Sequence, residues 1–69
     1  MEETFINSAE DMQWLKDVHI HNLSDDARSA IIIGNEDAPY SIKVYDKVDP
    51  LVTDTPRLYV WPGMVEVTA

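Results

Sequence analysis

The sequence contains no cysteine. Disulfide bonds are therefore excluded, and so are the zinc-finger ligand sets that depend on cysteine. This absence matters in a chain of 69 residues, because a domain of this size has a small core and is often stabilised by a disulfide, a metal or an oligomer partner. The domain must therefore be stabilised either by a compact core of its own or by a core that a partner completes.

Basic residues are scarce. Five stand against 13 acidic residues, which gives a formal net charge of −8, and they are scattered singly as Lys16, Arg28, Lys43, Lys47 and Arg57. Direct nucleic-acid binding requires a basic surface that replaces phosphate counterions. That class is therefore disfavoured, as is binding to anionic membranes. A basic protein partner, mimicry of nucleic acid, or solubility alone each fit the charge.

Long apolar runs are also missing. The longest unbroken aliphatic run is Ala30–Ile33, far shorter than a membrane span. The start, Met1–Thr4, lacks the basic region of a signal peptide. We therefore expect synthesis in the cytoplasm, and association with a virion is left open.

Apolar residues make up 45% of the chain, which is ordinary for a folded protein and too high for a disordered one. We expect one domain over residues 1–69, with an N-terminal segment and short helix in residues 1–17 and a β domain in residues 18–69. Residues 1–7 read as a polar lead. Ser8 is a typical helix N-cap, with Asp11 three residues on, and predicts a helix over Ala9–Lys16.

The rest of the chain alternates as strands do. The expected strands are separated by turn-forming residues, including Asn22–Asp26, Gly34–Asp37 and Pro62–Gly63. A short helix from Ala27 is an alternative within this part. The predicted strands are residues 18–21, 30–33, 41–48, 57–61 and 64–68. With no regular helix between them the sheet should be mainly antiparallel. The predicted fold is mainly β with one short N-terminal helix, arranged as a small antiparallel sandwich or partly open barrel.

The alternation also predicts which side chains form the core. The aliphatic residues on one face of the strands are the expected members: Ile20, Ile32, Val44, Leu58, Val60, Val65 and Val67. The β-branched run Ala30–Ile33 is typical of a strand that is covered on both faces.

The opposite face of two strands carries Tyr45, Tyr59 and Trp61, flanked by Lys43 and Arg57. Aromatic residues and arginine are enriched at protein interfaces. We therefore predict that these five residues form a partner-binding surface. The alternative is that the aromatic side chains form a second core layer or a lid under the helix.

Residues for catalysis or metal binding are weakly represented. His19 and His21, with Asp17, would share one face of a strand, but two histidines so spaced recur without a metal. The acidic pairs Asp25–Asp26 and Glu36–Asp37 fall in predicted turns, where carboxylates are normally solvated, and no calcium loop, glycine-rich phosphate loop or nucleophile elbow is present. We predict no catalytic residue, no metal and no cofactor.

One pattern has a wider parallel. The segment Val18–Ser24, the strand Ile31–Gly34 and the closing Leu58–Val67 with its Pro62–Gly63 turn together resemble small β-sandwich modules of bacteriophage virions, such as head-decoration and fibre proteins. The resemblance covers roughly residues 18–68 and carries no functional residue over. It implies a virion accessory or decoration subunit.

These observations favour a non-catalytic structural or protein-interaction module. Its expected partner is another protein, either a virion subunit or the basic surface of an enzyme, and a homo-oligomer is left open. No direct nucleic-acid or membrane contact is expected. The alternative is a small acidic inhibitor that mimics nucleic acid and blocks a basic cleft on its partner.

Overall fold

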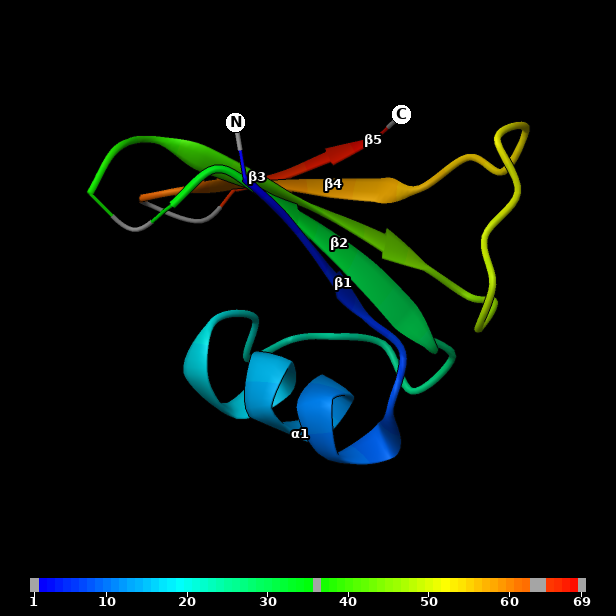
Figure 1. The fold of residues 1–69 in the computed structure, drawn as a ribbon. Coiled ribbons are helices and arrows are strands. Elements are labelled where there is room, and N and C mark those ends of the chain that lie inside the picture. The colour runs from blue at the N-terminus through cyan, green and yellow to red at the C-terminus, as the bar shows by residue number, and fades with distance from the viewer. Residues whose placement is uncertain (1, 36, 63–64, 69) are drawn as a thin grey trace.

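The computed structural model describes residues 2–35, 37–62 and 65–68, the last four by their backbone. A single antiparallel sheet carries one helix on one of its faces (Figure 1). The prediction of a mainly β antiparallel fold with one short N-terminal helix is confirmed. The elements in chain order are β1 Glu3–Ile6, α1 Ala9–Val18, β2 Ser29–Ile33, β3 Tyr40–Tyr45, β4 Arg57–Trp61 and β5 Val65–Thr68.

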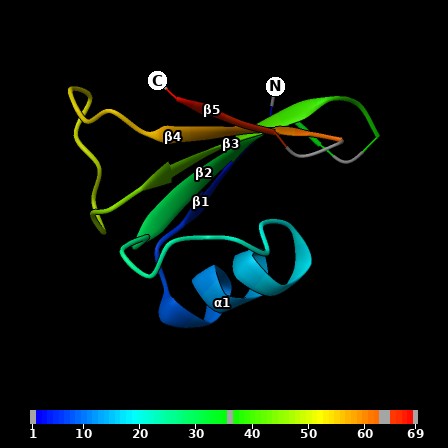
Figure 2. The same cartoon turned by 180° about the vertical axis from the view of Figure 1, so that it is seen from behind.

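The sheet is open. Its five strands lie in the order β1-β2-β3-β4-β5, so β1 and β5 are its edges. Seen from both sides, α1 and the segment that follows it lie on one side of the sheet (Figures 1 and 2), and no described element covers the other side. The finer choice between a sandwich and a partly open barrel stays a prediction.

Helix α1 begins where the sequence indicates. Ser8 has extended backbone angles, and its Oγ accepts a hydrogen bond of 3.1 Å from the Asp11 amide. The acidic residues Glu10 and Asp11 occupy the first turn and Lys16 the last, which suits the helix dipole. No helix in the described part of the chain is long and apolar enough to cross a membrane.

The predicted strand at residues 18–21 is wrong. The helix continues to Val18, and the amides of His19 and Ile20 both donate to the Leu15 carbonyl, each at 2.9 Å. Leu15 and His19 are both buried, and their spacing of four residues places them on the same side of a helix. The helical spacing of buried residues therefore describes residues 15–19 better than the strand-like alternation over residues 18–21. Ile20 is buried in the core from the turn that follows the helix.

Strand β1 lies inside the segment predicted to be a polar lead. Its residues Thr4 and Phe5 pair with Ile32 and Ile31 of β2. Three of its four residues are exposed and only Ile6 is buried. An edge strand of this kind shows no hydrophobic alternation, which explains why the sequence pattern missed it.

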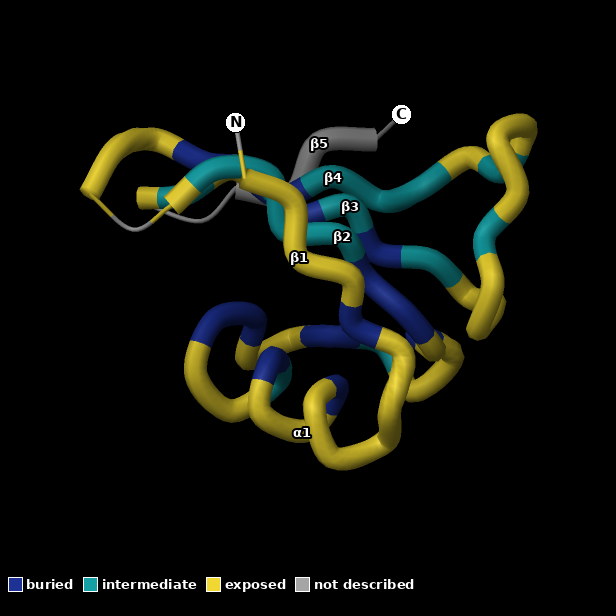
Figure 3. Tube along the Cα trace, in the orientation of Figure 1, coloured by how far each residue is buried: buried dark blue, intermediate teal, exposed yellow. Residues whose placement is uncertain are grey.

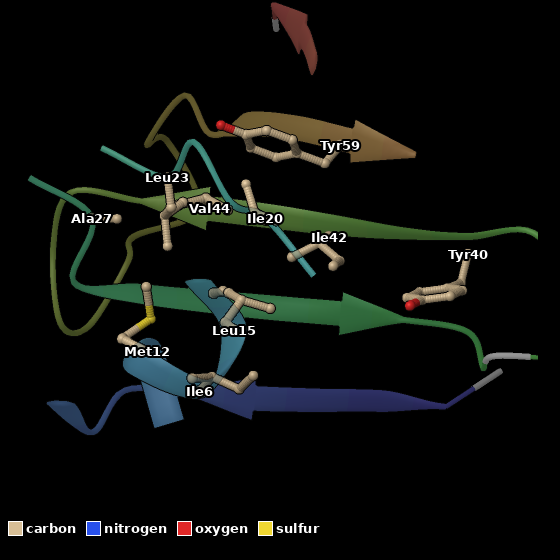
Figure 4. Packing of buried hydrophobic residues seen from close by; sticks show 11 residues of the cluster. Ile6, Met12, Leu15, Ile20, Leu23, Ala27, Tyr40, Ile42, Val44 and Tyr59 are labelled. Carbon is tan, nitrogen blue, oxygen red and sulfur yellow. The ribbon is translucent and has the colours of Figure 1, made fainter. Parts of the chain in front are cut away.

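The core lies between the helix and the sheet (Figure 4). Figure 3 shows the buried positions on the side of α1 that faces the strands. Ile20 and Val44 are buried as predicted, and Ile32 packs against the core. The side chains of Val65 and Val67, also predicted for the core, lie outside the described residues, as does Gly63 of the predicted Pro62–Gly63 turn.

On β4 the predicted faces are inverted. Tyr59 is 2% exposed, whereas Val60 is 43% exposed and Leu58 half-buried. The reason is the register, in which Tyr59 pairs with Ile42 and Leu58 pairs with Lys43. Paired residues share a face, so Tyr59 joins Ile42 in the core and the two aliphatic side chains point away from it.

Candidate functional site

The candidate site is the sheet face that α1 does not cover, which we call the outer face. Alternate residues of a strand point to opposite sides, so the buried residues of each strand identify their outward neighbours. By strand register the described outer face consists of Glu3, Phe5, Ile31, Ile33, Ser41, Lys43, Tyr45, Leu58 and Val60, together with Ser29, which pairs with Tyr45 but is buried.

Apolar side chains on this face lie on both sides of the central strand β3, which presents Ser41, Lys43 and Tyr45 there. Phe5 is 48% exposed and Val60 43%, while Ile31, Ile33 and Leu58 are half-buried. An antiparallel sheet with one solvated face usually presents polar residues there. Exposed apolar surface of this kind marks interaction sites in soluble proteins. The arrangement can therefore bind an apolar surface.

Charge is nearly absent from the outer face. Among its described residues, two are charged at neutral pH: Lys43 on the central strand β3 and Glu3 on the edge strand β1. One base and one acid give no net charge, although the chain as a whole carries −8. The excess negative charge therefore lies elsewhere on the molecule.

The predicted interface residues do not lie together. Lys43 and Tyr45 are half-buried on the outer face, whereas Arg57, Tyr59 and Trp61 belong to the opposite face of the sheet. Tyr59 is buried in the core, and Trp61 packs against it. The assignment of Tyr59 to an exposed surface is therefore wrong, and the alternative of an aromatic layer under the helix describes its place better.

Arg57 is occupied by a surface ion pair. Its guanidinium lies 2.8 Å from a carboxylate oxygen of Asp46, and its side chain is 29% exposed. This pair connects the first residue of β4 to the loop that follows β3. This contact gives Arg57 a structural role beside any role in binding.

The sequence did contain one signal for the outer face. The run Ala30–Ile33 predicts a strand covered on both sides, and β2 alternates between the core, through Ala30, and the outer face, through Ile31 and Ile33. Leu58 and Val60, which the alternation predicts for the core, belong to this face because of the register with β3.

A second cluster surrounds His19, which is 6% exposed. Its Nδ1 lies 3.0 Å from the Tyr40 hydroxyl oxygen, and its ring centroid lies 4.8 Å from that of Trp14 and 5.4 Å from that of Trp61. Nε2 is buried and has no hydrogen-bond partner among the described residues.

This cluster does not match the predicted histidine pair. His21 is exposed in the turn after α1, so His19 and His21 do not share a strand face. In the described part of the chain no three His, Asp or Glu side chains form a group that could hold a metal. Edge-to-face rings around a buried imidazole stabilise packing, so we interpret the cluster as part of the core.

A cavity of about 430 Å³ opens between α1, the segment before β2 and Val48. Its lining includes the buried apolar residues Met12, Leu23 and Ala27 and the basic residues Lys16 and Arg28. Both cations already have contacts: the Lys16 ammonium lies 3.8 Å from an Asp25 carboxylate oxygen, and Arg28 donates to the carbonyl oxygens of Asp25 and Ala27. The cavity is therefore a weaker candidate for ligand binding than the outer face.

The loop between β3 and β4 is held by Asp54. Its carboxylate accepts hydrogen bonds from the Leu51 amide at 2.7 Å and from the Lys47 ammonium at 3.1 Å. These donors, the Leu51 amide first, hold the pKa of Asp54 below its ordinary value. The same loop exposes Leu51 and Val52.

We expect Asp54→Asn to lower the melting temperature at pH 7 but not in acid. A carboxyl whose pKa is depressed by folding stabilises the folded state above its unfolded pKa, and this stabilisation is lost as the pH falls through the lower folded value. The difference in melting temperature between the two proteins should therefore shrink below about pH 4. Asp49→Asn is the control, since the structure shows no such contacts there. A difference that is constant with pH would contradict this role for Asp54.

No family model, no curated protein and no solved structure matches this chain. The resemblance to virion modules therefore stays a prediction.

Proposed function

We propose that this protein is a non-catalytic protein-interaction module that binds its partner through the outer face of the sheet. The observation that carries the proposal is the exposure of Phe5 and Val60 beside Ile31, Ile33 and Leu58 on a face that no described element covers. A partner docked there would supply the second layer of the sandwich predicted from the sequence. A virion accessory subunit is one form that such a module takes.

Burial of the apolar side chains of the outer face is the expected source of binding free energy. Burying apolar surface contributes about 25 cal/mol per Å², and the centre of an interface is depleted in charged residues. The outer face offers apolar side chains on β1, β2 and β4, on both sides of the central strand β3, which carries its single cation, Lys43. Its chemistry therefore fits an apolar partner surface better than a polar or strongly charged one.

A second candidate function is supported by a different part of the molecule. The exposed acids Glu10, Asp11 and Asp17 lie on α1, and Asp25 and Asp26 are exposed in the following turn. An acidic layer of this kind fits the inhibitor that blocks a basic cleft. The two functions use opposite sides of the molecule, so one experiment can separate them.

We expect Val60→Asp to reduce capture of a specific partner by at least tenfold, which corresponds to about 1.4 kcal/mol. A carboxylate in the middle of an apolar interface would be buried without a partner. The measurement is quantitative affinity capture from the native source with the tagged chain. The matched control is the pair Asp25→Lys and Asp26→Lys, which leaves the outer face unchanged.

The outcomes discriminate between the functions. A protein that is captured by the wild type and the lysine variant but lost with Val60→Asp supports the outer face. Capture that survives Val60→Asp and is lost with the lysine variant contradicts this proposal and favours the acidic inhibitor. Circular dichroism confirms that each variant is folded.

A further inference from the structure

We infer that one occupant of the outer face is a second copy of this chain, so that two sheets pack face to face across a two-fold axis. The inference rests on the proposed function, because it names a partner for the same face. Its support is the charge of the face and the placement of that charge, and the area of the face sets the expected strength.

The charge of the face favours self-association over a basic partner. Two copies with a net charge of −8 each repel one another when their acidic surfaces meet. The outer face avoids this repulsion, since Lys43 and Glu3 are the charged residues among its described members. A basic partner would find little negative charge there to attract it.

The two charges are placed so that the face can complement itself. Glu3 pairs with Ile33 on β2, and Ile31 of the same strand pairs with Lys43. Glu3 and Lys43 therefore lie on a diagonal with Ile31 and Ile33 between them, about 12 Å apart by strand spacing and residue rise.

A two-fold interface repeats each contact, with residue i meeting residue j and j meeting i. When the axis lies in the interface, passes between Ile31 and Ile33 and runs at right angles to the line from Glu3 to Lys43, it places Lys43 of each copy beside Glu3 of the other. The isoleucines of both copies then pack at the centre. An axis through Lys43 would instead bring two ammonium groups together, so the charges select the first arrangement.

The area sets the expected strength. Because the axis crosses β2, the second strand of five, chiefly β1, β2 and β3 of the two copies face one another. Three strands at about 4.8 Å spacing and about five residues in length give a footprint of about 250 Å² per copy. The total is below the roughly 1,200 Å² that stable specific interfaces bury, so we expect a weak, reversible dimer.

The test is a charge exchange in the purified full chain, followed by sedimentation equilibrium from about 1 μM to about 1 mM. Lys43→Glu and Glu3→Lys should each weaken dimerisation at least tenfold, because each variant puts like charges together twice. The double variant should restore the dissociation constant to within about threefold of the wild type. Both positions are at the surface, and circular dichroism checks the fold.

Each result has a defined meaning. A chain that stays monomeric throughout the range overturns the dimer but leaves the proposed function standing, because capture of a different partner that is sensitive to Val60→Asp tests that function separately. A dimer that neither single reversal weakens, or that the double variant does not restore, overturns the proposed axis. A charge-restored dimer combined with captured partners that ignore Val60→Asp supports the dimer and contradicts the broader binding role.

Discussion

Replacing Tyr59 with alanine is expected to unfold most of the protein. Tyr59 is 2% exposed and is among the largest fully buried side chains. Removal of a buried aromatic ring costs about 3–5 kcal/mol, which approaches the total stability expected for a small domain, about 5 kcal/mol. Urea denaturation followed by circular dichroism measures the loss as a lower midpoint or as a chain that is already unfolded in water.

The neighbouring residue provides the control. Val60→Ala removes a side chain that is 43% exposed on the outer face, so the expected loss is below about 1 kcal/mol. Comparing the stability losses of the two variants shows which face of β4 is buried in the core. A neutral Tyr59→Ala beside a severe Val60→Ala would restore the orientation predicted from the sequence and would remove Val60 from the proposed interface.

Gly34→Ala is expected to be the second most damaging substitution. Gly34 follows the last residue of β2 and has φ of +107°, and a Cβ added there would lie 2.6 Å from the Cβ of Tyr40. Such backbone angles cost a residue with a side chain about 1–3 kcal/mol, and the overlap with Tyr40, which is buried, adds to this. We expect a total loss of roughly 3 kcal/mol or more, measured by thermal and urea unfolding.

A substitution in the same turn separates strain from simple loop effects. Ala38 is exposed and carries no comparable constraint, so Ala38→Gly should cost less than about 1 kcal/mol. Equal losses for the two variants would mean that the turn tolerates a side chain at Gly34, and the close approach of Tyr40 would then need another explanation.

Local signals predicted the parts of this fold that depend on local chemistry. Ser8 caps the helix because its hydroxyl satisfies an amide three residues on, a relation visible in the sequence. The strands predicted at residues 30–33, 41–48 and 57–61 from β-branched and aromatic residues between turn formers correspond to β2, β3 and β4, although β3 ends at Tyr45 and not at Val48. Their antiparallel pairing follows from the lack of connecting helices.

The parts that failed depend on contacts distant in sequence. The face of β4 was wrong because alternation gives two faces but does not say which one is buried. Aliphatic Leu58 and Val60 seemed the better core residues, yet the register with β3 places Tyr59 opposite Ile42. The sequence alone gives no means of reading that register.

The predicted interface was wrong for the same reason. The predicted interface combined Lys43 and Tyr45 with Tyr59 and Trp61, which would share a face only if β3 and β4 were in the opposite phase. The isoleucines of β2 were the better guide, since an unbroken β-branched run needs cover on both sides. What the sequence could not tell is that, among the described elements, α1 covers only one of the two faces.

The strand order has a consequence for how the sheet opens and closes. β2, β3, β4 and β5 are joined by direct connections, whereas β1 reaches β2 only across α1, with Thr4 meeting Ile32. Closing that longer loop costs more chain entropy than closing the other pairings, so we expect the edge strand β1, in which only Ile6 is buried, to open more readily than the central strands. Amide hydrogen exchange should therefore be faster in β1 than in β3. Because Glu3 and Phe5 belong to β1 and to the outer face, each opening event would also dismantle one side of the binding surface, and an occupant of that surface would slow exchange at the edge of the sheet.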